Sequence, residues 1–146
     1  MPSEDMADRA RAREARAREL LTQFEDKQRE AEEQFVSGFT SMQRRVADNA
    51  RNHGFWEAMP PHLTTSALAR LMLVTTELAE AAEAVRASIP QRSDHLDNYS
   101  LEEEEIADAV IRLMDYAESR HIDLANALVA KVKYNTGRSH LHGKRA

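Results

Sequence analysis

Two acidic motifs with the same three-residue spacing constrain this chain more than any other feature. They are Glu77-Leu-Ala-Glu80 and Glu105-Ile-Ala-Asp108, and both lie in stretches with helical periodicity. Positions i and i+3 of an α-helix lie only about 60° apart around its axis. Each motif can therefore direct two carboxylates to one place. Two such helices packed together would surround a hard divalent cation such as Mg²⁺.

Glu77 is the acid whose surroundings argue most strongly for a specific role. Val74 lies three residues before it, and Leu73 and Ala81 lie four residues to either side. A carboxylate among apolar neighbours is costly unless a cation or a proton neutralises it. The acidic run at 102–105 is, by contrast, typical of a solvated helix face. Solvated faces therefore remain an alternative explanation for the acids as a group.

Turn-forming residues are scarce, with four glycines and four prolines among 146 residues. Together with abundant Ala, Glu, Arg and Leu, this composition predicts an all-α chain. We expect a helical bundle of about four core helices with a long N-terminal helical extension, assembled into an oligomer. The expected bounds are 1–45 for the extension, 46–138 for the bundle domain and 139–146 for a basic tail.

Apolar residues recur at three- and four-residue steps along most of the chain, which is the helical period. The proline pair at 60–61 interrupts this pattern. The expected helices are 5–52, as one long helix or two collinear ones, 64–87, a third from Ser100, and a fourth from Asp123 to about Asn135. Thr64 or Thr65 is the expected N-cap of the second helix, and Ser100 begins a capping box with Glu103.

The acids of the third helix lie away from its expected core. The expected core stripes are Leu68, Leu71, Leu78, Ala82 and Val85 in the second helix and Ile106, Ala109, Val110, Leu113 and Ala117 in the third. Glu105, Asp108 and Arg112 lie on roughly the opposite side of the third helix. Taken alone, this geometry favours exposure to solvent. The acids become internal if helices pack on both sides, as they would in an oligomer.

Composition excludes several classes of protein. The chain has no cysteine, which excludes disulfides and thiolate metal sites and is compatible with a cytoplasmic location, which we expect. The first eighteen residues are charged and have no apolar core, so we expect no signal peptide. No apolar run approaches the ~20 residues of a membrane helix, so we expect no membrane partner. The net charge of −5 gives no general attraction to nucleic acid.

Five arginines between Arg9 and Arg18 form the one stretch that suggests a nucleic-acid partner. No aromatic residue lies among them for base stacking, and Glu14 and Glu19 dilute their charge. A solvated helix is therefore favoured, and nucleic acid is not an expected partner. The apolar stripe over 20–46 is better explained as a packing or oligomerisation face.

Two further features carry groups suited to a nucleotide. Trp56, the only tryptophan, is expected in a loop within residues 53–63, where it either fills the bundle core or offers a stacking surface for a nucleobase. Lys131, Asn135 and Arg138 follow one another at i, i+4 and i+7, which places them along one edge of the fourth helix. The two cations can meet phosphate oxygens there, and the amide can contact a sugar hydroxyl or water.

Together these motifs resemble the MazG-like nucleotide pyrophosphohydrolases of the all-α NTP pyrophosphatase superfamily. The resemblance covers about two-thirds of the chain, from about residue 47 to 144. The matching segments are His53-Gly-Phe-Trp-Glu57, Glu77-Leu-Ala-Glu80-Ala-Ala-Glu83-Ala-Val-Arg86, Glu104-Glu-Ile-Ala-Asp108-Ala-Val-Ile-Arg-Leu, Ile122-Asp-Leu, Lys131-Val-Lys-Tyr-Asn135, Arg138 and His142-Gly-Lys144. A single ExxE motif is weak, but ExxE and ExxD at this separation, followed by the Lys, Tyr-Asn and Arg string, form a specific signature. The N-terminal extension departs from the family pattern and receives no role from it.

The resemblance implies an enzyme that uses Mg²⁺, with Mn²⁺ as the alternative ion, to hydrolyse (deoxy)nucleoside triphosphates to the monophosphate and pyrophosphate. It implies Glu77, Glu80, Glu105 and Asp108 as catalytic metal ligands and Lys131, Asn135 and Arg138 as contacts to the phosphates or sugar. Trp56 is added, from its chemistry, as a candidate contact to the base. Family members are oligomers with sites completed between subunits, so a homodimer or homotetramer is expected. The alternative is a non-catalytic helical oligomer or partner-binding relative of that family.

Overall fold

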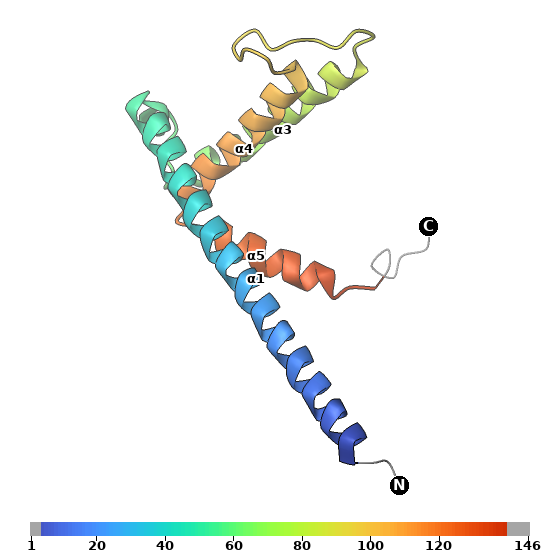
Figure 1. Cartoon of the computed structure of the whole chain (residues 1–146). Helices are drawn as coiled ribbons and strands as arrows, with labels where there is room; N and C mark the ends of the chain where they lie inside the picture. Colours follow the sequence, from blue (N-terminus) through green and yellow to red (C-terminus); the bar gives the residue numbers. More distant parts are fainter. Residues whose placement is uncertain (1–3, 140–146) are drawn as a thin grey trace. The chain divides into compact units, whose positions relative to one another are not determined.

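The structure is a computed structural model that describes residues 4–139. Over this range the secondary structure is helical, without a β-strand, which confirms the predicted all-α class. The elements are α1 Glu4–Asn52, α2 Phe55–Ala58, α3 Thr64–Arg86, α4 Leu101–Ser119 and α5 Leu124–Thr136 (Figure 1). The expected basic tail lies outside the described residues except for Ser139.

The chain divides into two compact units, Met1–Gly38 and Phe39–Ala146. The first unit is the N-terminal part of α1, whose apolar residues Leu20, Leu21 and Phe24 are between 50% and 58% exposed. Ion pairs one turn apart on this helix, such as Arg16 with Glu19 at 2.7 Å, belong to a solvated surface. The predicted domain bounds of 1–45, 46–138 and 139–146 remain predictions.

Within the second unit, α3 and α4 form an antiparallel hairpin joined by residues 87–100 (Figure 1). Its buried apolar residues are mostly small: Ala67, Val74, Ala81 and Ala84 on α3 and Ala109, Met114 and Ala117 on α4. Small side chains at a helix–helix contact allow the two axes to approach closely. The same two helices also bury the charged residues Arg70, Glu77 and Glu104.

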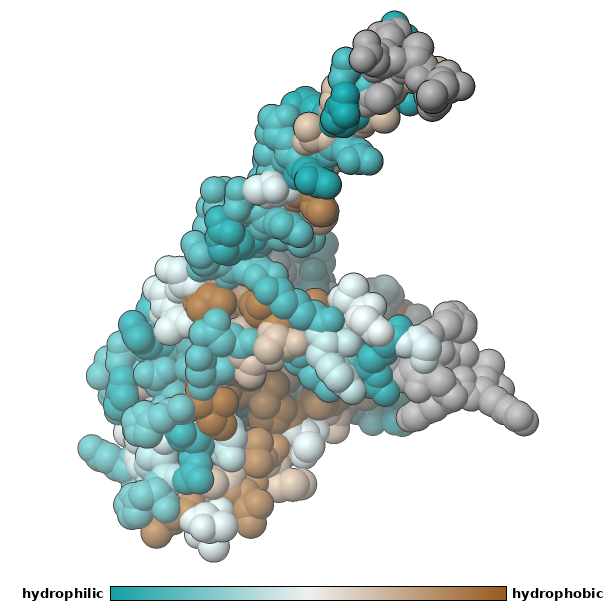
Figure 2. Space-filling view, turned by 90° about the horizontal axis from the view of Figure 1, so that it is seen from below, coloured by the Kyte–Doolittle hydropathy of each residue, from teal (hydrophilic) through white to brown (hydrophobic). Residues whose placement is uncertain are grey.

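The predicted core stripes of α3 and α4 are wrong for the single chain. Their large members are exposed, from 37% at Leu71 to 62% at Val85 on α3 and from 40% at Leu113 to 46% at Ile106 on α4. Only the alanines Ala109 and Ala117 of the α4 stripe are buried. The two helices instead meet through small apolar residues and through the ion pairs Arg112–Glu77 and Arg70–Asp115, and the large apolar residues of the stripes are left at the surface. Exposed apolar residues are visible in Figure 2.

Local capping signals locate the helix ends well. At the start of α4 the Ser100 hydroxyl accepts from the Glu103 amide, and the Glu103 carboxylate accepts from the Ser100 amide at 2.8 Å, so the predicted capping box is confirmed. Asp123 caps α5 as predicted. The predicted N-cap of α3 is wrong. Thr64 and Thr65 already lie inside the first turn, and the cap position falls on Leu63, which has no side-chain acceptor.

Trp56 lies in the short helix α2 and joins that helix to the hairpin. Its Nε1 donates to Oδ1 of Asp115 at 2.8 Å, and Arg70 donates to the other oxygen of the same carboxylate at 2.7 Å. Arg70 also donates to the carbonyl oxygen of Met59 at 3.0 Å. The Arg51 guanidinium lies 4.6 Å from the centre of the Trp56 ring. The half-buried tryptophan is therefore held in a polar network that ties α2 to α3 and α4.

Candidate metal centre

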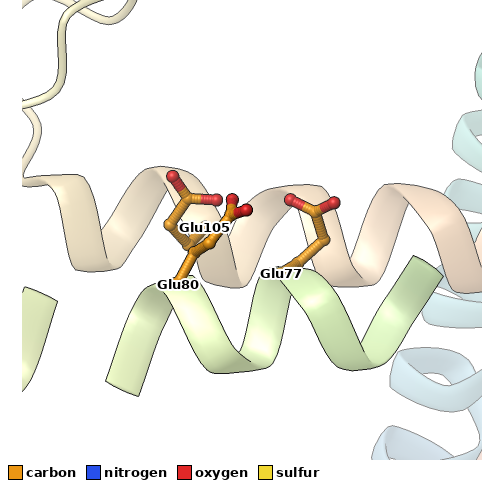
Figure 3. A group of neighbouring side chains, drawn as sticks. All are labelled: Glu77, Glu80 and Glu105. Atoms are coloured by element: carbon orange, nitrogen blue, oxygen red, sulfur yellow. The ribbon is translucent and has the colours of Figure 1, made fainter. Parts of the chain in front are cut away.

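Three carboxylates converge on one side of the hairpin, and they come from both acidic motifs. Glu77 and Glu80 rise from α3 and Glu105 rises from α4, with their oxygens gathered together (Figure 3). One oxygen of each lies within 4.8 Å of one oxygen of each of the others. The predicted convergence of the two motifs on a possible acidic metal-binding cluster is thus present for three of the four acids.

Antiparallel packing is what brings these residues together. Glu105 on α4 lies beside Glu80, Arg112 contacts Glu77, and Asp115 contacts Arg70. The residue number on α3 falls as the number on α4 rises, so each turn of one helix meets one turn of the other. The i, i+3 spacing puts Glu77 and Glu80 on one side of α3, and Glu105 of α4 meets them there.

The dimensions of the group suit a small divalent cation. Oxygens bound to Mg²⁺ at about 2.1 Å lie at most roughly 4.2 Å apart. The observed oxygens lie within 4.8 Å of one another, which is close to this spacing. Carboxylate oxygens are the ligands that Mg²⁺ prefers, so the residues present fit such an ion.

Asp108 is not a member of the group of three. It lies one turn after Glu105 on α4 and is close enough for Glu77 to affect its titration. Burial and the charge of Glu77 raise the pKa of Asp108, whereas the charge of Arg112 lowers it. Its predicted role as a fourth metal ligand remains a prediction.

The buried Glu77 has a cation partner, as its apolar sequence neighbours required. Arg112 donates from Nε to its Oε1 at 2.6 Å, and only 6% of the Glu77 side chain is exposed. One guanidinium cannot balance the three carboxylates of the group. Burial and the neighbouring acids Glu80 and Glu77 accordingly raise the pKa of Glu105 to about 7. The group retains an excess of negative charge that a bound cation would neutralise.

Sequence reasoning missed the environment of Glu104. This residue belongs to the acidic run that we assigned to a solvated face, yet it is buried and its carboxylate contacts Nδ1 of His95 at 2.7 Å. Hydrogen bonding to Ser93 and then to His95 lowers the pKa of Glu104, and the same contact to Glu104 raises the pKa of His95. His95 and Ser93 lie in an irregular loop, so no periodic signal in the sequence announced the pairing.

The predicted phosphate contacts lie elsewhere in the chain. Lys131, Asn135 and Arg138 are all exposed on or just after α5. The Lys131 ammonium and the Arg138 guanidinium lie 4.7 and 5.8 Å from the ring centre of Tyr134. α5 follows the C-terminal end of α4. At 1.5 Å per residue, that end, Ser119, lies about 21 Å along the helix from Glu105. Within the described part of one chain, no contact links the three acids to Lys131, Asn135 or Arg138.

Comparison of the chain with models of known protein families, with curated proteins and with solved structures finds no match. Among the described helices, none combines the length and apolar content that a membrane crossing needs.

We predict that the metal-free protein loses stability as the pH rises from about 5 to about 8. The pKa of Glu105 is about 7 in the folded chain, against an ordinary value of 4.5 for a glutamate. Folding is therefore favoured while the group is protonated, and this gain is lost above the folded pKa. The raised pKa of His95 acts in the same direction. Urea unfolding in a chelating buffer measures the effect, and saturating Mg²⁺ restores the lost stability at the higher pH.

The Glu105→Gln variant provides the specific check on that prediction. It removes the titrating group, so its free energy of unfolding changes less with pH than that of the unaltered chain. Glu83→Gln, at an exposed position on α3, keeps the full pH dependence. An equal pH dependence in the unaltered chain and in Glu105→Gln contradicts the assignment.

Proposed function

We propose that the protein is a Mg²⁺-dependent hydrolase that converts (deoxy)nucleoside triphosphates to the monophosphate and pyrophosphate. The observation that carries the proposal is the convergence of Glu77, Glu80 and Glu105, with one arginine among three acids. The resemblance of the motifs to MazG-like pyrophosphohydrolases supports the choice of reaction. A triphosphate is anionic and would be repelled by the carboxylates unless a cation lay between them. A metal ion bound by the acids would therefore also bind the phosphates of the substrate.

The residues of the chain suggest a division of roles. Glu77, Glu80 and Glu105 would hold the metal, which when bound neutralises phosphate charge and lowers the pKa of water. A carboxylate outside the group of three is better placed to accept a proton from the attacking water. Asp108 fits that role as well as the predicted ligand role, because its pKa is raised and it lies beside Glu77.

Substrate contacts from α5 require a second copy of the chain under this proposal. Lys131 and Arg138 supply the fixed cations that a leaving pyrophosphate needs, and Asn135 can contact a sugar hydroxyl. In one chain these residues make no described contact with the acids. The exposed apolar stripes of α3 and α4 provide a face by which a second copy could present its α5, in a homodimer or homotetramer.

One observation favours a second candidate function. Arg112 already neutralises the buried Glu77. The same ion pair would be expected in a helical protein whose acids have only a structural role. Under this alternative the chain is a non-catalytic helical oligomer or partner-binding protein. It would show no Mg²⁺-dependent turnover and no change in stability on adding Mg²⁺.

A product assay tests the proposed reaction. We expect the unaltered chain with Mg²⁺ to release pyrophosphate from at least one canonical or modified dNTP, and Glu77→Ala to abolish the release. Lys131→Ala and Arg138→Ala should each lower kcat/KM roughly ten- to a hundredfold, because each loses a charge-assisted phosphate contact of about 1.5–3 kcal/mol. Lys133→Ala, on another side of α5, is the matched control. Release of orthophosphate, or no turnover across the panel, contradicts the proposal.

We also expect the chain to self-associate through the exposed stripes of α3 and α4. The mass in solution, measured by light scattering at micromolar concentration, should be at least twice the 16.6 kDa of one chain. Leu78→Lys places a charge in the stripe and should shift the protein toward the monomer. Glu83→Lys introduces the same side chain elsewhere on α3 and should leave the mass unchanged. A monomeric mass for the unaltered chain rules out this assembly.

A further inference from the structure

A second feature of the hairpin lies beside the carboxylate group and has a different character. It is a cavity of about 210 Å³ between the end of α1, the short helix α2 and the middle of α4. Its walls include the apolar side chains of Val46, Phe55 and Ile111 and the polar side chains of Asn49, Asp108 and Arg112. All of these residues belong to the second compact unit.

The cavity and the carboxylate group share a border. Arg112 lines the cavity and donates to Glu77. Asp108 also lines the cavity, and the charge of Glu77 contributes to its raised pKa. A molecule whose charged end lay at the three acids could therefore extend into this cavity.

The size and lining of the cavity suit one flat heteroaromatic ring system. Sites for drug-sized ligands measure roughly 300–1,000 Å³, so this smaller space fits a base rather than a whole nucleotide. Phe55 is 56% exposed and offers an unshielded ring for stacking. Asn49 has both a donor and an acceptor for a polar ring edge, and the planar Arg112 guanidinium can stack or donate.

Trp56 does not offer the same surface, although it neighbours Phe55. Its Nε1 is bonded to Asp115, and Arg51 and Arg70 lie 4.6 and 5.5 Å from the centre of its ring. These contacts already engage the Trp56 side chain in the network that joins α2 to α3 and α4. The exposed aromatic ring that lines the cavity is Phe55.

We propose that this cavity binds the base of the substrate nucleotide, with Phe55 as the stacking surface and Asn49 as the contact to its polar edge. This inference rests on the proposed function, because it makes the cavity a part of the same site. It replaces Trp56 with Phe55 as the base contact and gives Trp56 a structural role.

Binding of deoxynucleosides without phosphate tests the cavity apart from the metal. Trp56 is the only tryptophan, and it contacts Asp115, which also lines the cavity, so its fluorescence reports on occupancy. The probes are 2′-deoxyadenosine, 2′-deoxyguanosine, 2′-deoxycytidine and thymidine in a chelating buffer. We expect a saturable change with at least one probe, weakened about tenfold or more in Phe55→Ala. Asn49→Ala should change which deoxynucleoside binds best.

Tyr99→Ala is the matched control, because Tyr99 is a similarly exposed aromatic residue, at 54%, that does not line the cavity. It should bind the deoxynucleosides as the unaltered chain does. Circular dichroism and light scattering on each variant separate lost binding from lost folding or assembly. A Phe55→Ala chain that is folded but changed in mass assigns the cavity to contact with a second copy and overturns the proposal.

Turnover separates failure of this inference from failure of the proposed function. If the chain hydrolyses dNTPs and Phe55→Ala leaves KM unchanged, the base binds outside this cavity. That result contradicts the assignment of the cavity but not the proposed hydrolase activity. If deoxynucleosides bind through Phe55 but no dNTP is hydrolysed, the assignment of the cavity is supported and the proposed hydrolase activity is contradicted. With both correct, Phe55→Ala raises KM about tenfold while kcat stays near that of the unaltered chain.

Discussion

The pairing of Arg112 with Glu77 across the α3–α4 seam is the interaction on which the rest of the site depends. It joins the two helices at a contact that otherwise buries mostly small apolar residues, and it gives the buried Glu77 carboxylate a cation partner. The same register places Glu80 beside Glu105 and Arg70 beside Asp115. Small residues at the seam let the axes approach, so one close helix pair both forms the hairpin and concentrates negative charge.

That concentration of charge links the fold to its proposed chemistry. Acids that lie this close together are stabilised by holding a proton, which the raised pKa of Glu105 expresses, or by binding a cation. Two further features accompany this contact. The cavity lined by Phe55 and Asn49 gives the site an apolar neighbour, and the apolar stripes displaced to the surface give the hairpin a face for another copy.

Local signals predicted much of this molecule, whereas tertiary contacts lay beyond them. The capping box at Ser100 and the cap at Asp123 involve residues three apart, so the sequence contains both partners. The i, i+3 spacing of the acids likewise predicted convergence. The Arg112–Glu77 pair joins residues 35 apart in the sequence, and the amphipathic pattern of α4 did not predict which side of that helix meets α3. The burial of Glu104 against His95, in an irregular loop, had no periodic signal at all.

The most direct test of the account is a crystal structure of the chain grown with Mn²⁺, whose anomalous scattering locates the ion. The account predicts a peak bounded by the carboxylates of Glu77, Glu80 and Glu105 at about 2.1 Å from their oxygens, close to the Mg²⁺ distance. Crystals of Glu105→Gln grown in the same way should lose most of that peak. A hairpin in which Arg112 is the sole cation at the three acids, with no peak at saturating Mn²⁺, would contradict the central claim.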